Sequence, residues 1–234
     1  MRKERDSMKI ATYNIAAGQY CHQDLGLLSK MIDEQGIDVL GVQEVDHKTG
    51  RSQQVNQIEA LKSKETTFSA FHKAIDFDGG AYGLGCLVNM PTLEVTSEPL
   101  ESNGFEQRIY QKISIKIGER TGSFYNTHLS FEDTKTRKDQ MAYLKRLLDE
   151  DEAEFKIVTG DFNIEDRSEF ELFLEDYQIA NGHNGVWHDT FPGEDCVTHQ
   201  LDNIILSKNL HINEVGMIKN NYSDHCMLWV DVSD

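Results

Sequence analysis

The sequence has few cysteines and no long hydrophobic run, and each shortage excludes a class of protein. The four cysteines, Cys21, Cys86, Cys196 and Cys226, include no Cys-x-x-Cys pair, so zinc-type spacing is lacking. Cys86 and Cys226 lie within apolar runs, which predicts buried, reduced thiols. No apolar stretch approaches the roughly eighteen residues that a membrane-spanning helix needs.

Proline is scarce as well, and the N-terminus lacks a signal-like segment. Only three prolines occur in 234 residues, and no low-complexity linker or charge block marks a domain boundary. We therefore expect a flexible leader at residues 1–7 and a single globular domain at residues 8–234. The charged N-terminus has no apolar segment behind it, so a cytoplasmic location is the default expectation.

Acidic residues outnumber basic ones. The chain has 23 Lys and Arg against 40 Asp and Glu, which gives a formal net charge of −17. Nonspecific binding of nucleic acid depends on basic residues that neutralise phosphates. The densest basic patch, between Lys135 and Arg146, is mixed with acids and is typical of a solvated helix face. The composition therefore disfavours duplex nucleic acid as a partner without excluding it.

Hydrophobic periodicity predicts an alternation of helices and strands. An apolar stripe after Asp24 predicts a helix with Asp24 as its N-cap and Gly36 as its stop. Residues 38–43 then form a strand, and residues 134–150 form a second amphipathic helix. Residues 88–117 are typical of meandering strands. The pattern indicates an α/β protein.

Six strand-like segments carry polar side chains at their ends. In chain order these side chains are Asn14, Glu44, His128, Asp161 with Asn163, Asp202, and Asp224 with His225. Any one of them alone is more typical of a cap or turn than of a site. Together, such acid, amide and imidazole groups favour metal-assisted phosphoryl chemistry.

In this order, the segments closely resemble the endonuclease/exonuclease/phosphatase superfamily, which has the DNase I-like fold. The resemblance spans residues 10–232, and the motifs Gln43-Glu44-Val45-Asp46 and Asn126-Thr127-His128-Leu129 are similar to those of its short bacterial members. The resemblance implies a four-layer α/β sandwich, in which helices flank two central, mostly antiparallel β-sheets.

The resemblance also implies a metal cofactor. A divalent cation offsets the negative charge of a phosphate ester, and Mg²⁺ or Mn²⁺ takes hard oxygen ligands. Glu44 is implied as the principal metal ligand, with the amide oxygen of Asn14 beside it. Some family members carry an acid two residues after this asparagine, where this chain has Ala16. The number of metals is therefore left open.

Catalytic roles follow from the same resemblance. Asp161 would take the proton of the attacking water, and Asn163 would hold that water. His225 would donate to a phosphate oxygen, and Asp202 would keep His225 cationic.

Two other residues complete the implied site: His128 would be a second phosphate contact, and Asp224 would line the metal pocket. Many short relatives read Arg-Ile-Asp-Tyr where this chain has residues 200–203, Gln-Leu-Asp-Asn. A substrate contact is expected to differ there, whereas Asp202 is retained.

Two arginines are expected to bind the substrate. Arg51 lies in the polar loop of residues 46–54, and Arg108 opens the strand of residues 109–117. Guanidinium groups bind phosphate through paired hydrogen bonds. The alternative for each is a surface arginine in a weak ion pair.

The function expected from these observations is hydrolysis of a small phosphodiester or phosphomonoester by a metal-dependent enzyme. A lipid headgroup, an inositol phosphate and a nucleotide-like ester are the candidate substrates. A Mg²⁺-dependent endonuclease or exonuclease is the alternative, and a catalytically silent binding protein is the second. The intact set of site residues argues against silence, and the oligomeric state is left open.

Overall fold

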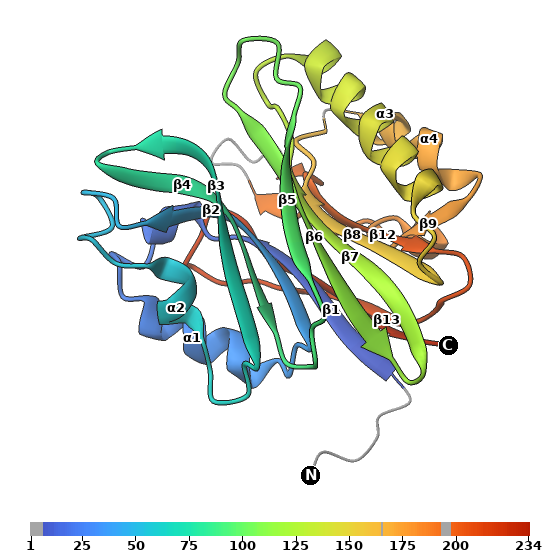
Figure 1. The fold of residues 1–234 in the computed structure, drawn as a ribbon, viewed down its shortest axis with the longest axis horizontal. Coiled ribbons are helices and arrows are strands. Elements are labelled where there is room, and N and C mark those ends of the chain that lie inside the picture. The colour runs from blue at the N-terminus through green and yellow to red at the C-terminus, as the bar shows by residue number, and fades with distance from the viewer. Residues whose placement is uncertain (1–6, 165, 193–197) are drawn as a thin grey trace.

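Two six-stranded β-sheets pack face to face at the centre of the molecule (Figure 1). The computed structural model describes residues 7–164, 166–192 and 198–234. The first sheet has the order β13 (His211–Ile218), β14 (Met227–Ser233), β1 (Ser7–Asn14), β2 (Val39–His47), β4 (Gly80–Val88), β3 (Phe68–Phe77). The second has the order β5 (Val95–Leu100), β6 (Arg108–Ile117), β7 (Arg120–His128), β8 (Phe155–Asp161), β12 (Asp202–Ser207), β9 (Tyr177–Ile179). A separate two-stranded ribbon joins β10 (Phe191–Pro192) to β11 (Thr198–His199).

Helices cover the outer face of each sheet (Figure 1). The helices α1 (Leu25–Glu34) and α2 (Gln57–Leu61) lie on the first sheet, and α3 (Thr134–Glu150) and α4 (Glu171–Leu174) lie on the second. Three short 3₁₀ turns complete the elements: η1 (Ala16–Gly18), η2 (Arg167–Phe170) and η3 (His183–Gly185). The expected four-layer sandwich is confirmed.

Three apolar clusters correspond to the three interfaces between these layers. The cluster between the sheets contains Ile10, Val39, Phe124 and Ile157, all fully buried. One further cluster lies between each sheet and the helices that cover it. Each sheet is therefore buried on both faces, which explains why its central strands are almost continuously apolar.

Most of the expected elements are present, with one local correction. The helix α1 begins after Asp24 as predicted, but the Asp24 side chain makes no capping hydrogen bond. The helix α3 has the predicted bounds, and Asp133 caps it by accepting from the backbone N–H of Thr136 at 2.7 Å.

Predictions about the cysteines and the N-terminus have mixed outcomes. Cys86 and Cys226 are buried free thiols, as expected, whereas Cys196 lies outside the described residues. Of the expected leader, residues 1–6 also lie outside them, but Ser7 already belongs to β1 and pairs with Ser233. None of the helices in the described ranges is long and apolar enough to cross a membrane.

Two parallel strand pairs position the site. In each sheet one β-helix-β unit makes a parallel pair, β1 with β2 through α1, and β7 with β8 through α3. Parallel neighbours end at the same edge of a sheet, so Asn14 and Glu44 meet in the first sheet and His128 and Asp161 meet in the second. The antiparallel strand β12 then brings Asp202 opposite Asp161.

Candidate active site

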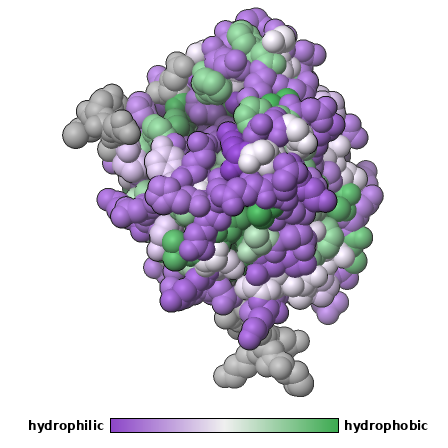
Figure 2. Space-filling model, turned by 90° about the vertical axis from the view of Figure 1, so that its left-hand side faces the viewer, coloured by the Kyte–Doolittle hydropathy of each residue, from purple (hydrophilic) through white to green (hydrophobic). Residues whose placement is uncertain are grey.

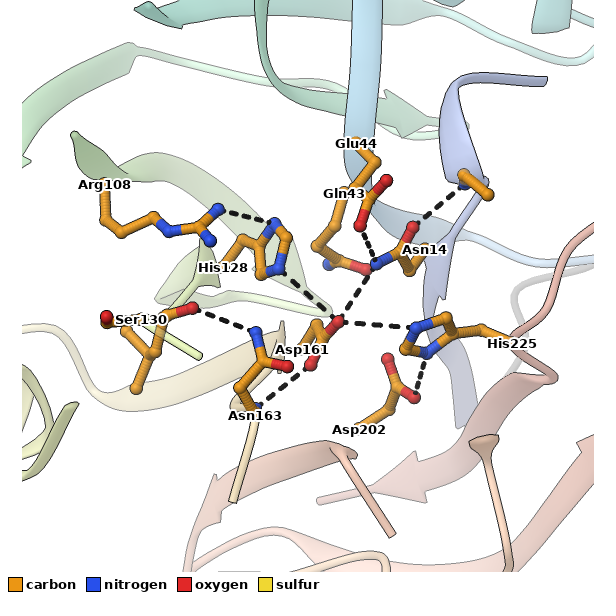
Figure 3. Close-up of polar contacts among 12 residues, drawn as sticks. Asn14, Gln43, Glu44, Arg108, His128, Ser130, Asp161, Asn163, Asp202 and His225 are labelled. Carbon is orange, nitrogen blue, oxygen red and sulfur yellow. Dashed lines mark hydrogen bonds and ion pairs between the residues drawn. The ribbon is translucent and has the colours of Figure 1, made fainter. Parts of the chain in front are cut away.

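Side chains from both sheets converge at this common edge (Figure 3). The predicted residues that meet there are Asn14, Glu44, His128, Asp161, Asn163, Asp202 and His225. Asn14 and Asp161 are 147 positions apart in sequence, yet their side chains are 3.0 Å apart. Packing of one sheet on the other therefore assembles the site.

A β-bulge in β2 directs Glu44 into the site. Val42 pairs with Gly85 and Val45 with Gly83, so two residues of β2 face a single residue of β4. The bulge places Glu44 at a φ of +54°, which is uncommon for a residue with a side chain. Gln43, the other bulge residue, points inward between the sheets instead. The bulge thus gives two neighbouring residues different environments.

The amide of Asn14 acts as a donor to both acids in this structure. Its Nδ2 donates to Glu44 Oε1 and to Asp161 Oδ2, each at 3.0 Å. Its Oδ1 accepts the backbone N–H of Ala16 at 2.9 Å, which fixes the orientation of the amide. The oxygen of Asn14 therefore faces the backbone rather than Glu44. The predicted role of Asn14 as a metal ligand stays a prediction.

Asp161 is surrounded by donors. Its Oδ2 accepts from Asn14, and its Oδ1 accepts the backbone N–H of Asn163 at 3.0 Å. The Nε2 atoms of His128 and His225 lie 3.5 Å and 3.6 Å from its Oδ2. Burial, which the charge of His225 partly offsets, raises the pKa of Asp161 to about 7. Asp161 is therefore a carboxylate that can accept a proton near neutral pH.

His225 is held between two carboxylates. Its Nδ1 is 2.8 Å from Asp202 Oδ2, and its Nε2 faces Asp161. Burial lowers its pKa, but the negative charges of Asp202 and Asp161 outweigh this effect and raise the pKa to about 10. His225 is therefore a buried imidazolium at neutral pH, with both ring nitrogens acting as donors.

His128 has the opposite protonation state. Its Nδ1 lies 3.1 Å from Nη1 of Arg108, and a guanidinium can only donate, so Nδ1 accepts and Nε2 carries the proton. Burial, assisted by the charges of Arg108 and His225, holds the pKa of His128 well below its usual value. His128 is thus a neutral donor directed at Asp161.

Asn163 occupies the turn directly after β8. Its φ is +50°, and its Nδ2 donates to the carbonyl oxygen of Leu129 at 3.0 Å. Because the amide nitrogen is engaged in this way, the side-chain oxygen of Asn163 is directed away from Leu129 and is left as an acceptor.

The remaining predicted residues lie around this centre, and the two arginines among them are already paired with carboxylates. Arg51 makes a two-pronged ion pair with Asp46, at 2.7 Å and 2.9 Å. Arg108 Nη1 lies 2.8 Å from Glu106 Oε1. Asp224 accepts from the hydroxyl of Tyr20 at 3.3 Å. The substrate-binding roles of the arginines remain predictions.

The oxygen donors of the site fit a hard divalent cation at Glu44. Burial raises the pKa of Glu44, and its second oxygen has no partner among the residues that the structure describes. Ligand atoms of Asp161, Asp202 and His225 also lie within 4.8 Å of one another. A cationic imidazole has no lone pair for a metal, however, so this second cluster is better suited to holding protons.

Sequence reasoning missed several residues that hold the site together. The hydroxyl of Ser223 donates to the Asn14 carbonyl at 2.7 Å and accepts the N–H of His225 at 3.2 Å. The hydroxyl of Thr190 accepts the N–H of Asp202 at 3.1 Å, and the ring of Phe191 lies 4.9 Å from that of His225. Ser223 stands beside a predicted residue in the chain. Thr190 and Phe191 belong to a Thr-Phe-Pro stretch shortly before the Asp202 strand, which is a weak sequence similarity to the family.

Solved structures of similar fold include proteins from bacteria and animals. D. rerio TDP2 complexed with single strand DNA product has a TM-score of 0.75 and 15% identity, and the match covers 98% of this chain and 100% of that one. A functionally unknown conserved protein from Enterococcus faecalis V583 has a TM-score of 0.76 and 20% identity, covering 97% and 99%. The human Nocturnin catalytic domain with bound sulfate anion has a TM-score of 0.73 and 20% identity, covering 97% and 93%. At such identities these likenesses establish the fold.

No curated protein matches the sequence. A family model does match, and it extends from the first strand to His225. It is described as the Endonuclease/Exonuclease/phosphatase family, and it matches residues 11–225. This chain belongs to that family, whose members are hydrolases of phosphate esters.

Proposed function

We propose that this protein is a divalent-metal-dependent hydrolase of small phosphate esters. The observation that carries the proposal is the environment of Asp161, a base with a neutral imidazole on one side and an imidazolium on the other. Such a set of groups can deprotonate a water and stabilise the negative charge of a reacting phosphate at the same time.

Glu44 would hold the cation, Mg²⁺ or Mn²⁺, through its open carboxylate oxygen. When bound, the cation would offset the charge of the phosphate and of the leaving oxygen. Asn14 would orient Glu44 and Asp161 by donating to both.

The chain's own residues would carry out the proton transfers. Asp161 accepts a proton from the attacking water, whose oxygen forms a bond to phosphorus while the bond to the leaving oxygen breaks. The amide oxygen of Asn163 accepts the second hydrogen of that water and orients it, because the amide nitrogen is held by the Leu129 carbonyl. His225 donates a hydrogen bond to a nonbridging phosphate oxygen, and Asp202 holds its ring in place.

The charges around the site favour a small substrate. Arg51 and Arg108 each share their charge with a carboxylate, Asp46 and Glu106, so little uncompensated positive charge remains for a long polyanion. A nucleotide-like diester, an inositol phosphate and a lipid headgroup all meet this condition. The second candidate is a nuclease, and the similarity to TDP2, solved with a single strand DNA product, favours it.

The test is a panel of substrates assayed with Mg²⁺, from nitrophenyl mono- and diesters and inositol phosphates to single-stranded and duplex DNA. We expect turnover of a small ester that excess chelator abolishes. Glu44→Gln should raise the metal concentration for half-maximal activity by about tenfold or more. Glu98→Gln, at an exposed position in β5, is the matched control. Full activity in chelator, or an unaffected Glu44→Gln enzyme, would refute the proposal.

A further inference from the structure

Buried side chains from the second sheet bond to the backbone around the β2 bulge. A bulge disrupts the hydrogen-bonded ladder locally, so the buried backbone groups beside it need other partners. The Nδ2 of Asn126 in β7 donates to the carbonyl oxygens of Val42 at 3.2 Å and Gly85 at 2.9 Å. Val42 and Gly85 are the last residues of β2 and β4 that pair before the bulge. One side chain therefore bonds to both strands at the point where the bulge begins.

Gln111 in β6 extends this contact to the residue opposite the bulge. Leu84 lies between Gly83 and Gly85, so it is the single β4 residue that the two bulge residues face. The Nε2 of Gln111 donates to the Leu84 carbonyl at 3.4 Å, and its Oε1 accepts from Asn126 Nδ2 at 3.1 Å. Asn126 and Gln111 are both fully buried. Three backbone carbonyls around the bulge thus bond to amides of the other sheet.

The orientation of these amides is fixed, because backbone carbonyls can only accept. The nitrogen of Asn126 faces the bulge, so its oxygen accepts from Gln43 Nε2 at 2.7 Å. Gln43 keeps this orientation although its own Oε1 is buried without a partner in the described part of the chain. At the other end, Gln111 Nε2 lies 2.8 Å from Nδ1 of His72. That Nδ1 must accept, so the proton of the neutral His72 ring is on Nε2.

Glu44 requires such support because its backbone conformation is strained. A φ of +54° is unfavourable for a residue with a side chain and persists only where the surrounding structure enforces it. The bond from Asn14 orients the carboxylate of Glu44 but does not hold its backbone. The amides of Asn126 and Gln111 are the groups that bond to the backbone on both sides of the bulge.

We propose that Asn126 is a positioning residue for Glu44, because it fixes the β2 bulge that directs the Glu44 carboxylate into the site. Gln111 and His72 brace Asn126 from the side away from Gln43. Asn126 acts through the backbone of β2 and not through contact with the substrate. The inference rests on the proposed function for the cation that Glu44 would hold.

The first test is Asn126→Leu, which keeps the approximate size of the side chain and removes its donors. Mn²⁺ is titrated into the folded variant by calorimetry, without substrate. We expect a Kd about tenfold higher than that of the parent, as for other residues that orient a metal ligand. In an ester assay, the Mn²⁺ concentration for half-maximal activity should rise likewise, whereas kcat at saturating Mn²⁺ should fall much less. A general loss of stability would not produce this difference.

Thr127→Val is the matched control. Thr127 is the next residue of β7 and is equally buried, and its hydroxyl also donates to a backbone carbonyl, that of Ile109, at 3.2 Å. Neighbouring residues of a strand point to opposite faces, so Thr127 points away from the bulge. The variant should be less stable than the parent and bind Mn²⁺ equally well. Mn²⁺ binding that is weakened to the same extent in Thr127→Val and Asn126→Leu would overturn the proposal.

Gln111→Met carries the test if Asn126→Leu does not fold. It removes the brace and leaves Asn126 bonded to Val42 and Gly85, so the Kd for Mn²⁺ should rise by a smaller factor, about threefold. Nitrogen NMR of the parent should find the His72 proton on Nε2. A proton on Nδ1 would contradict the orientation of the amides, and an unchanged Kd in the folded variants would contradict the role of Asn126.

The titration without substrate also separates this proposal from the function on which it rests. Weaker Mn²⁺ binding by Asn126→Leu, in a protein that hydrolyses no ester, would support the positioning role and refute the hydrolase. Ester hydrolysis with unchanged Mn²⁺ affinity in the folded variants would overturn the positioning role alone. A parent protein that binds no divalent cation would refute both.

Discussion

Asp161 shows how strongly neighbours can change one side chain. It is a fully buried carboxylate whose contacts are all donors, yet burial still raises its pKa to about 7. His225, equally buried, is shifted in the direction of its charged form because two carboxylates face it. The two residues form a base and an acid that coexist at neutral pH.

These shifts predict a bell-shaped pH dependence of kcat. Only ionised Asp161 accepts a proton, so activity should rise as the pH increases through a value at or below about 7, since a bound cation lowers the pKa of a nearby carboxylate. Only protonated His225 donates, so activity should fall as the pH passes about 10. The measurement is kcat from pH 5 to 10.5 with saturating Mg²⁺. Asp161→Asn should lower kcat by about 10²–10⁴-fold at every pH.

Asp202→Asn tests the other half of the pair. Removing the negative charge 2.8 Å from His225 should lower the histidine pKa, so the alkaline limb of the profile should move to lower pH. Imidazole NMR of the folded variant measures that pKa directly. Asp176→Asn, an exposed position on the surface, serves as the control. An unchanged His225 pKa in Asp202→Asn would contradict the assignment.

At the level of strands, close approach of the two sheets is what brings the halves of the site together. A Cβ on Gly41 in β2 would lie 2.2 Å from the hydroxyl of Thr159 in β8 and 2.6 Å from the side-chain oxygen of Asn126 in β7. Gln43, two residues later, donates to that same Asn126 oxygen at 2.7 Å. The glycine therefore allows a buried polar contact between the sheets just behind the catalytic residues.

Gly41→Ala should accordingly destabilise the protein, by about 1–3 kcal/mol, because overpacking forces neighbouring atoms to move. Urea unfolding followed by circular dichroism gives the change. The opposite sign is expected for Gly26→Ala in α1, because the nearest atom, at 3.2 Å, is the end of the Asp24 side chain, which can move aside, and alanine favours the helix. A Gly41→Ala midpoint equal to that of the parent would show that the sheets separate easily.

For the molecule as a whole, negative charge dominates. The net charge is −17, and the face in Figure 2 is mostly hydrophilic with small scattered apolar areas. An anionic substrate is therefore repelled at long range and held only by local contacts at the site.

This charge predicts an unusual response to salt. Added salt screens repulsion, so the KM for a small anionic ester should stay constant or fall between 20 and 200 mM NaCl. Duplex DNA should bind weakly over the same range, measured by fluorescence anisotropy. An affinity for duplex that drops by about 10³-fold or more with salt would instead indicate many phosphate contacts and favour the nuclease alternative.

The chain order of polar groups at strand ends was enough to infer the family, the four-layer fold and the residues expected at the site. Strand periodicity and strand-end side chains are local properties, so they can be seen in the sequence without coordinates. The bounds of α3 followed in the same way from its apolar stripe.

Contacts between distant segments were decided by the packing of the two sheets. The β2 bulge that gives Gln43 and Glu44 opposite environments depends on the register with β4, which the β2 sequence does not encode alone. The orientation of the Asn14 amide and the partners of Arg51 likewise arise from neighbours that only the folded chain supplies. Hydrogen bonds and pKa values depend on distances of a few ångströms between such segments, and those distances exist only once the sheets have packed.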